Sequence, residues 1–151
     1  MINENPGEIR EKFFNFLLKK PCSSGDAEEY LSKHGVPEEY KNLFLTQASN
    51  LGLIDDAAYA KLFVEGHLTW GNAKIIYELS RRGFSRDEID TALDESEDEI
   101  SRACELAEDW RKIGLDERKI MNRLLSRGFS RSSVNEAKKQ ESGTKFPNSC
   151  F

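Results

Sequence analysis

Long apolar stretches are absent from this chain. None of its hydrophobic runs approaches the roughly 18 residues that a helix needs to cross a bilayer. Residues 1–10 are polar and include acidic side chains, whereas a secretion signal carries basic residues followed by an apolar segment. We therefore expect a soluble, cytoplasmic protein without a membrane partner.

Cysteine is also scarce, with three residues in the whole chain. Cys22, Cys104 and Cys150 are widely spaced, and no histidine cluster lies near them. An odd number of separated cysteines argues against a disulfide framework and against a zinc site. The sequence therefore predicts reduced thiols.

Catalytic motifs are missing as well. The sequence has neither the glycine-rich loop that cradles phosphates nor the serine elbow of hydrolases. His34 and His67 are isolated from each other, so we interpret them as surface or packing residues. Asp55 and Asp56 stand at an expected helix start, where carboxylates cap free amide groups. We predict no catalytic residue, no metal and no cofactor.

Proline is rare: the chain holds four, and between Val36 and Phe146 only Pro37 occurs. Because proline blocks the interior of a helix, its rarity leaves most of the chain open to helix. Charged residues make up 32% and hydrophobic residues 38%, which suits amphipathic helices better than a thick buried sheet. We predict an all-α fold.

An internal repeat is the strongest feature that is present. Residues 75–92 read IIYELSRRGFSRDEIDTA, and residues 120–137 read IMNRLLSRGFSRSSVNEA. Gly83 and Gly128 are 45 residues apart, and the apolar and serine positions keep the same offset. A constant offset across different residue types indicates a duplicated supersecondary unit.

A more degenerate copy precedes these two. Leu31 and Gly35 are four residues apart, as are Leu79 and Gly83. The apolar periods predict three tandem three-helix modules, and such a row predicts an elongated, curved, right-handed array. The expected limits are 8–53, 54–95 and 96–139, followed by a flexible tail at 140–151.

Helix ends are marked by capping residues and by glycine. A side-chain oxygen satisfies the free amides of a first turn, and glycine accepts the left-handed conformation after a last turn. The expected C-terminal glycines are Gly35, Gly52, Gly83, Gly114 and Gly128. The expected N-caps are Ser24, either Asp55 or Asp56, Asn72, Ser85 in a capping box with Glu88, and Ser130.

The middle module contains two distinctive stretches: residues 51–64 read LGLIDDAAYAKLFV, and residues 70–79 read WGNAKIIYEL. An Arg-Gly-Phe joint follows. With these residues, the module resembles the RecX family, regulators of the RecA recombinase. The family pattern has Leu-Asp-Asp, an aromatic-Ala pair and Phe-Val, then an arginine-rich stretch, Gly-aromatic-Gly-Pro and Glu-Leu before the glycine joint. The positions that match it are Asp55, Asp56, Tyr59, Ala60, Phe63, Val64, Gly71, Ile75, Glu78, Leu79 and Gly83.

Two departures from that pattern concern binding. The segment Glu65–Thr69 is about two residues shorter than the family pattern, lacks its arginines and carries His67 instead. Asn72 replaces the usual proline. The resemblance implies a monomeric protein that lodges in the groove of the RecA–DNA filament. There it would bridge protomers and restrain ATP hydrolysis, filament growth and strand exchange.

Charge is distributed unevenly along the chain. The net charge is −5, but residues 1–99 carry 11 basic against 20 acidic residues and residues 100–151 carry 11 against 7. Basic side chains on polar helix faces are the candidate contacts with the filament, with DNA contact inside it as a further candidate. These are Lys74, Arg81, Arg82, Arg86, Arg111, Lys112, Arg118, Lys119, Arg123, Arg127 and Arg131. Ordinary solvated helix faces are the alternative reading.

Two other functions remain open from the residues alone. The joint at Gly83 or Gly128 could form a helix-turn-helix that places the next helix in a DNA groove. Against this, the helix after Gly83 is rich in aspartate and glutamate, which phosphates repel. A general helical scaffold for protein partners is the second alternative, because a fold alone does not fix function.

Overall fold

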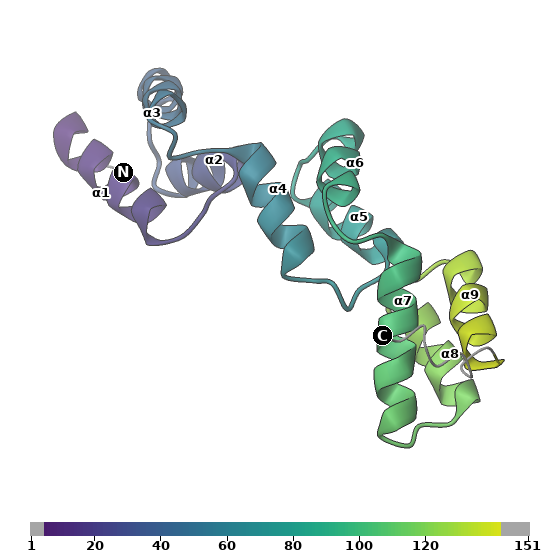
Figure 1. Ribbon diagram of the computed structural model, residues 1–151. Helices are drawn as coiled ribbons and strands as arrows, with labels where there is room; N and C mark the ends of the chain where they lie inside the picture. The colour runs from purple at the N-terminus through teal and green to yellow at the C-terminus, as the bar shows by residue number, and fades with distance from the viewer. Residues whose placement is uncertain (1–4, 143–151) are drawn as a thin grey trace. The chain divides into compact units, whose positions relative to one another are not determined.

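The computed structural model describes residues 5–142, and within them every helix or strand element is an α-helix (Figure 1). The elements are α1 (Pro6–Lys19), α2 (Ser24–Lys33), α3 (Glu38–Asn50), α4 (Asp56–Glu65), α5 (Asn72–Arg81), α6 (Arg86–Asp94), α7 (Glu99–Lys112), α8 (Glu117–Ser126) and α9 (Arg131–Ser142). The predicted all-α fold of tandem three-helix modules is thereby confirmed. No described helix is both long and apolar enough to cross a membrane.

Two compact units divide the chain, and their boundary falls inside α4. The first unit extends to Ala60, and the second starts at Lys61. The module limits 8–53, 54–95 and 96–139 stay predictions, because the boundary coincides with none of them. Helix α9 continues three residues past Lys139, into the segment expected as a tail. The rest of that segment, 143–151, lies outside the described residues.

The first unit is built around aromatic side chains. Phe13 of α1 is fully buried, and its ring stacks on Phe44 of α3 with ring centroids 6.4 Å apart. Tyr30 of α2 stacks on Phe16 at 4.3 Å. These pairs join three helices through large apolar surfaces, which is where most of the stabilisation of such a small core arises.

Helix α2 begins one residue earlier than the expected cap implies. Ser23, not Ser24, is the N-cap: its hydroxyl accepts from the Asp26 amide at 3.1 Å, and the Asp26 carboxylate accepts from the Ser23 amide at 3.4 Å. Ser24 instead donates its amide and its hydroxyl to Asp56, both at 2.7 Å. Either serine could have capped the helix. Because Asp26 pairs with Ser23 and Asp56 binds Ser24, the helix starts at Ser24 and Ser23 is its N-cap.

The expected cap at Asn72 is also wrong by one residue. Gly71 is the N-cap of α5, with an extended backbone and no side chain to offer. The Asn72 side chain is occupied elsewhere, because its oxygen accepts a hydrogen bond from Arg102. Three other caps are confirmed: Asp55 accepts from the Ala58 amide at 3.0 Å, and Ser85 and Ser130 each accept from the amide three residues later at 3.1 Å.

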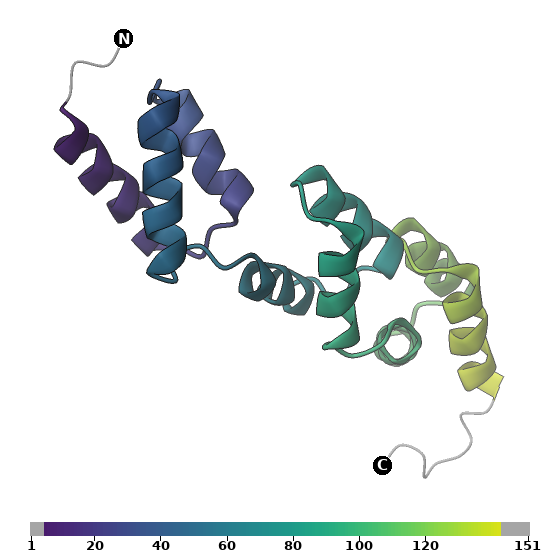
Figure 2. The same ribbon diagram turned by 90° about the horizontal axis from the view of Figure 1, so that it is seen from above.

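The 45-residue repeat persists in the buried positions of the second unit. Ile75, Leu79, Phe84, Ile89 and Ala92 are buried in the first copy, and Ile120, Leu124, Phe129, Val134 and Ala137 are buried in the second. Helices α7, α8 and α9 pack against one another in both views (Figure 1, Figure 2). Equivalent apolar positions thus form equivalent small cores.

Gly71 and Gly128 bring these two copies into direct backbone contact. The Gly71 amide donates to the Arg127 carbonyl at 2.8 Å, and the Ala73 amide donates to the Gly128 carbonyl at 3.3 Å. A methyl group on Gly71 would stand 2.1 Å from the carbonyl carbon of Gly128, a separation that no packing permits. We call this contact, made by Gly71, Ala73, Arg127 and Gly128, the glycine seam.

The seam can be tested with two matched glycine substitutions. Gly128→Ala places a methyl 2.7 Å from the Lys74 Cβ at a φ of +93°, whereas Gly83→Ala has a φ of +95° and nothing within 4 Å. Gly83→Ala should lower the free energy of unfolding by about 1 kcal/mol through backbone strain alone. Gly128→Ala should lower it by a further 1–3 kcal/mol or so through overpacking. Urea unfolding followed by circular dichroism measures both, and equal losses would contradict close packing at the seam.

Candidate partner-binding surface

A buried polar cluster holds the start of α7 against the loop before α5. Arg102 is 2% exposed, yet its guanidinium reaches the carbonyl of Glu97 at 3.0 Å and also donates to the carbonyl of Trp70 and the side chain of Asn72. A buried guanidinium is tolerated only when its donors find acceptors. Arg102 therefore fixes the path of the chain around Trp70.

Glu99, one turn earlier on α7, completes this cluster. Its carboxylate accepts hydrogen bonds from the backbone amide of Asn72 at 2.8 Å, from the Ser130 hydroxyl at 2.9 Å and from the Ser133 hydroxyl at 2.7 Å. The acceptor thus serves the first turns of α5 and α9 together, where helix amides are free and the helix dipole favours a negative charge. We call Glu99 and Arg102 with these partners the Glu99–Arg102 clamp.

The charges of the clamp are set by its surroundings. Burial acts to raise the pKa of Glu99, but the hydrogen bonds from Ser133, the Asn72 amide and Ser130 together bring that pKa below its ordinary value. Burial lowers the pKa of Arg102, although a guanidinium stays protonated at neutral pH. The clamp is therefore a charged structure under physiological conditions.

Sequence reasoning missed the clamp. The segment 94–99 reads as an acidic link, and Arg102 carries no motif. The one available signal was spacing, because Arg102 lies four residues before Leu106 on the face of α7 that also carries Ala103 and Ala107. A charged residue on an otherwise apolar stripe indicates a specific buried partner.

The predicted contact residues of the second module form several kinds of local pair. Arg81 pairs with Glu78 at 2.8 Å, and this hydrogen bond lowers the pKa of Glu78. Arg86 pairs with Asp90 at 2.9 Å on the exposed face of α6. The Lys74 ammonium lies 4.3 Å from the ring centroid of Trp70.

An aromatic stack occupies the end of α4 and the loop behind it. His67 lies 4.1 Å from the Phe63 ring and 4.2 Å from the Trp70 ring, and its Nδ1 is 2.7 Å from the Phe63 carbonyl. The Arg82 guanidinium carbon is 5.0 Å from the Phe63 ring centroid. His67 is thus a packing residue, as expected.

Arg111 does not lie on an exposed polar face, and that expectation is wrong. Its side chain is 14% exposed and forms two hydrogen bonds with Glu117, at 2.5 and 3.0 Å, and one with the Ala137 carbonyl at 2.8 Å. It thereby ties α7 to the start of α8 and to α9. The sequence could not show this, because Arg111 meets its partners only after the three helices have packed.

The other candidate contacts of the third module lie at or near the surface. Arg127 is half-buried: its guanidinium carbon lies 5.3 Å from the Trp110 ring centroid, and one nitrogen is 3.5 Å from the Thr69 carbonyl. The Arg123 guanidinium carbon is 6.0 Å from the same ring. The exposed residues of this group are Lys112, Arg118, Lys119, Arg123 and Arg131.

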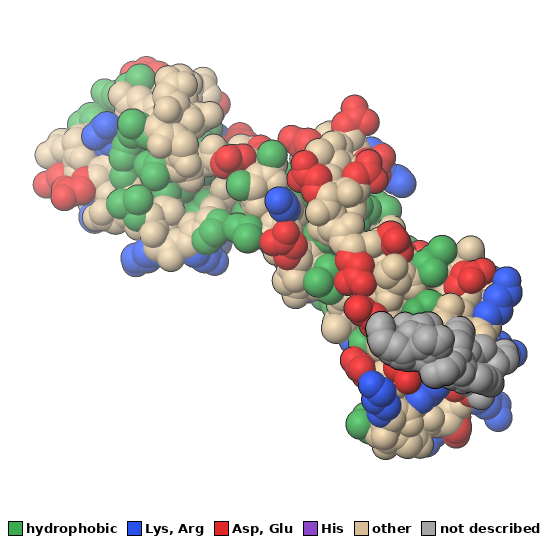
Figure 3. All heavy atoms as spheres, in the orientation of Figure 1, with side chains coloured by type: hydrophobic (Ala, Val, Ile, Leu, Met, Phe, Trp, Pro, Cys, Tyr) green, Lys and Arg blue, Asp and Glu red, His purple; other side chains and the backbone are tan. Residues whose placement is uncertain are grey.

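Charge is unevenly distributed over the second unit. In the face that Figure 3 shows, acidic side chains gather over α6 and the link into α7, whereas basic and acidic side chains are mixed over the α7–α9 module. An uneven distribution of charge can orient a charged partner. The basic side chains of the α7–α9 module are the better candidates for binding a negatively charged partner.

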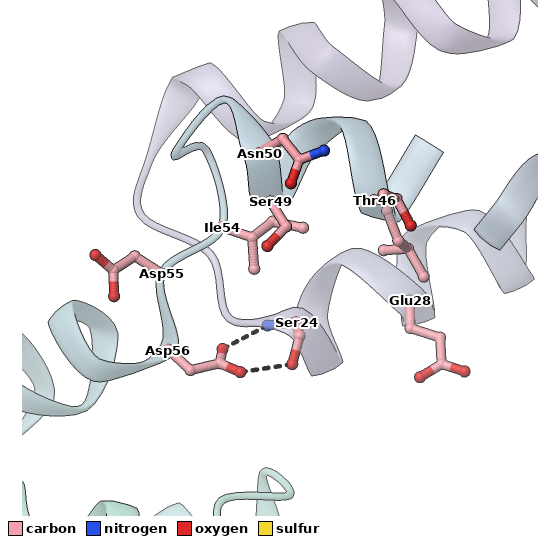
Figure 4. A pocket seen from close by; sticks show the side chains of 9 residues that line it. Ser24, Glu28, Thr46, Ser49, Asn50, Ile54, Asp55 and Asp56 are labelled. Atoms are coloured by element: carbon pink, nitrogen blue, oxygen red, sulfur yellow. Dashed lines mark hydrogen bonds between the residues drawn. The ribbon is translucent and has the colours of Figure 1, made fainter. Parts of the chain in front are cut away.

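A hollow of about 520 Å³ in the first unit shows what Asp55 and Asp56 do (Figure 4). Asp55 caps α4, and Asp56 accepts both hydrogen bonds from Ser24. Both carboxylates hold backbone in place, which agrees with the capping interpretation. Among the described residues, no three His, Cys, Asp or Glu side chains are grouped to hold a metal.

Comparison with known proteins points to one family. The model of "RecX, second three-helix domain" matches residues 55–93. A "Regulatory protein RecX" of Pseudomonas fluorescens is 30% identical over 136 residues, covering 83% of this chain and 86% of that protein. One of Lactobacillus delbrueckii subsp. bulgaricus is 31% identical over 128 residues, covering 78% of this chain. This chain spans about half of that second relative, 47% of its length.

A solved structure agrees on the fold. The crystal structure of RecX from Lactobacillus salivarius superposes with a TM-score of 0.77 at 22% identity, covering 89% of this chain and 95% of that one. At this identity, the likeness concerns the backbone architecture.

Replacing Glu99 by glutamine tests the clamp. The amide cannot accept every hydrogen bond that the carboxylate accepts, so unfolding should cost about 2 kcal/mol less near neutral pH. The pKa of Glu99 is lower in the folded protein than in the unfolded chain, where it is about 4.3. The ionised Glu99 therefore contributes its full stabilisation above pH ~4.3, and this contribution is lost as the pH falls through the folded-state pKa. The difference between wild type and Glu99→Gln should therefore vanish in strong acid.

The matched control is Asp109→Asn, which removes the same charge from an exposed position of the same helix. Chemical unfolding at a series of pH values measures both variants. If Glu99→Gln and Asp109→Asn have equal, small effects at neutral pH, Glu99 does not clamp the modules.

Proposed function

This chain belongs to the RecX family, and on that basis we propose that it regulates the RecA recombinase, mainly as an inhibitor. Its relatives are named regulatory proteins, and this chain covers 86% of the length of the Pseudomonas fluorescens protein. The regulated process is the RecA-dependent exchange of DNA strands in repair and recombination, including the SOS response to DNA damage.

The proposed mode of action is binding in the groove of the RecA–DNA filament. Modules in tandem present extended surfaces, which suit a long groove better than a single pocket. A protein lodged there would restrain the movements that accompany ATP hydrolysis, filament growth and strand exchange. If the protein contacts two neighbouring protomers at once, two individually weak attachments together give a high overall affinity.

The observation that carries this mode is the rigid connection of two modules in the second unit, with basic side chains near the surface of α8. The glycine seam and the Glu99–Arg102 clamp hold α5 against α7, α8 and α9. Arg118, Lys119 and Arg123 are exposed on α8. Fixed spacing reduces the conformational entropy lost on binding, so charges in such a frame bind more tightly than the same charges on a loose chain.

In this proposal the protein changes the ATPase of another enzyme and has no catalysis of its own. Asp55 and Asp56, the one adjacent carboxylate pair that the sequence singled out, are engaged in capping and in a contact with Ser24. A monomer acting in the cytoplasm, where RecA–DNA filaments assemble, completes the proposal.

A DNA-binding helix-turn-helix and a general scaffold are the competing functions. Helix α6 follows the Gly83 joint, and its Asp87 and Glu88 are exposed in the first turn. Phosphates would meet these carboxylates first, so α6 is a poor recognition helix. A scaffold for other proteins predicts no effect on RecA, which separates it from our proposal by experiment.

The function is tested on RecA filaments preformed on single-stranded DNA. Added protein should lower the rate of ATP hydrolysis and co-sediment with the filaments. Replacing Lys112, Arg118, Lys119 and Arg123 by alanine should weaken filament binding more than about tenfold, because four exposed charges are lost while no buried contact is touched. Circular dichroism should show unchanged helicity.

The matched control replaces four exposed lysines by alanine, which changes the net charge equally: Lys19, Lys20, Lys33 and Lys61. It should bind filaments nearly as well as the wild type. If saturating wild-type protein neither binds the filaments nor changes the rate of ATP hydrolysis, the proposed function is wrong. Equal losses in the two quadruple variants would show that only net charge matters.

A further inference from the structure

Two arginines in the second unit occupy equivalent places in its two modules. Arg82 is the C-cap of α5 and Arg127 is the C-cap of α8, and each precedes a glycine in the left-handed conformation, with φ of 95° and 93°. They are therefore related by the 45-residue repeat, together with the helices that carry them.

Each of these arginines also lies over an aromatic ring from the first helix of its own module. The Arg82 guanidinium carbon is 5.0 Å from the Phe63 centroid, and that of Arg127 is 5.3 Å from the Trp110 centroid. The rings are 47 residues apart rather than 45. The two extra residues lie in the loops, since residues 66–71 separate α4 from α5 and residues 113–116 separate α7 from α8. The pairing has thus been kept despite a change in loop length.

An arginine on an aromatic ring is well suited to hold an anion. The ring beside the guanidinium restricts its rotation, and the donors on the guanidinium edge form a planar fork. That fork matches the two oxygens of a carboxylate, and its prior restriction means that less entropy is lost on binding.

From this geometry we propose that Arg82 and Arg127 are paired carboxylate-binding sites, which engage acidic side chains repeated on the protein partner. The proposal rests on the proposed function, because that partner is the RecA protein of the filament. We refer to Arg82 on Phe63 and Arg127 on Trp110 as the two arginine hooks.

The separation of the hooks is fixed by the structure. Both lie in the second unit, where the Gly71 amide binds the carbonyl of Arg127 itself and the Glu99–Arg102 clamp joins α7 to the first turn of α5. Two anion sites at a set distance favour a partner whose acidic groups recur at a matching distance. A filament of identical protomers has such repeated groups.

The surroundings favour carboxylates on a protein over the phosphates of DNA. The first turn of α6, with Asp87 and Glu88 exposed, follows directly after the Arg82 hook. The chain as a whole carries a net charge of −5. These carboxylates repel any anion, but a DNA strand brings a continuous row of phosphates past them, whereas an acidic side chain brings a single charge and is repelled less.

The first module has no arginine at the equivalent position. Its Arg10 lies over Phe14 at 4.5 Å, but on the first helix of the module, where it donates a hydrogen bond to Gln47. The position before Gly35, equivalent to Arg82 and Arg127, holds His34, which stacks on Tyr30 of its own helix at 4.1 Å. Paired recognition is accordingly assigned to the second unit alone.

The test compares filament affinities of four variants with the wild type, using RecA filaments on single-stranded DNA as the probe. Arg82→Ala and Arg127→Ala should each weaken binding about tenfold, and the double variant should weaken it more than either. The double variant Arg82→Lys with Arg127→Lys keeps both charges but loses the planar forks, so it should stay weak. Thermal unfolding of each variant checks that the fold is intact.

The matched control is Lys61→Ala with Lys138→Ala, which removes one exposed basic side chain outside the candidate contacts from each of the same modules. It should change the affinity less than about threefold. Equal losses in the control and in the double hook variant would overturn the proposal, as would full affinity in the lysine variant. These results leave the proposed function standing, because the wild type still binds.

Bare single-stranded DNA of the same length is the second probe. If the hook variants lose as much affinity for bare DNA as for filaments, the hooks bind phosphates and the carboxylate assignment is wrong. Unchanged binding to bare DNA with loss on filaments supports it. A wild type that fails to bind filaments overturns both the proposed function and the hooks.

Discussion

Arg102 carries a full positive charge in the interior of a small helical unit, and the local structure is built around satisfying it. Its acceptors are the carbonyls of Leu68 and Trp70 in the loop before α5, the side chain of Asn72 at the start of α5, and the carbonyl of Glu97 just before α7. The loop before α5 must therefore follow one path. Glu99 adds the opposite charge and binds the first turns of two other helices. An arrangement of this kind adds modest net stability but penalises every alternative packing, since any other path leaves a buried charge without partners.

The repeat and the ends of most helices could be read from the sequence, because these features depend on local chemistry. The glycines at the helix ends and the capping box at Ser85 can each be recognised from a few neighbouring residues. Where two neighbouring residues could both cap, as at Ser23 and Ser24, the choice depended on Asp56, far along the chain. Local patterns thus fixed the existence of each helix and left its first residue to tertiary contacts.

The site was less predictable than the fold, for the same reason. A basic residue looks alike in a sequence whether it is solvated or buried. Arg111 was expected on a polar face and instead joins three helices, while Arg102 was overlooked and is the most buried charge among the described residues. Each has partners close in the sequence, but the Ala137 carbonyl is 26 residues from Arg111 and the Leu68 carbonyl is 34 residues from Arg102. These contacts form only when distant segments meet. The pairing of Arg82 and Arg127 with aromatic rings needs the same information.

The glycine seam contains no side chains at its closest point, and this has a consequence for how such proteins diverge. At an interface made of side chains, substitutions that change side-chain size also change the angle between the two modules. At Gly71 and Gly128 the contact is peptide against peptide, so the residues around it can change without altering the hinge angle. Substitutions on the outer faces can therefore change the chemistry of binding while the distance and angle between the two modules stay the same.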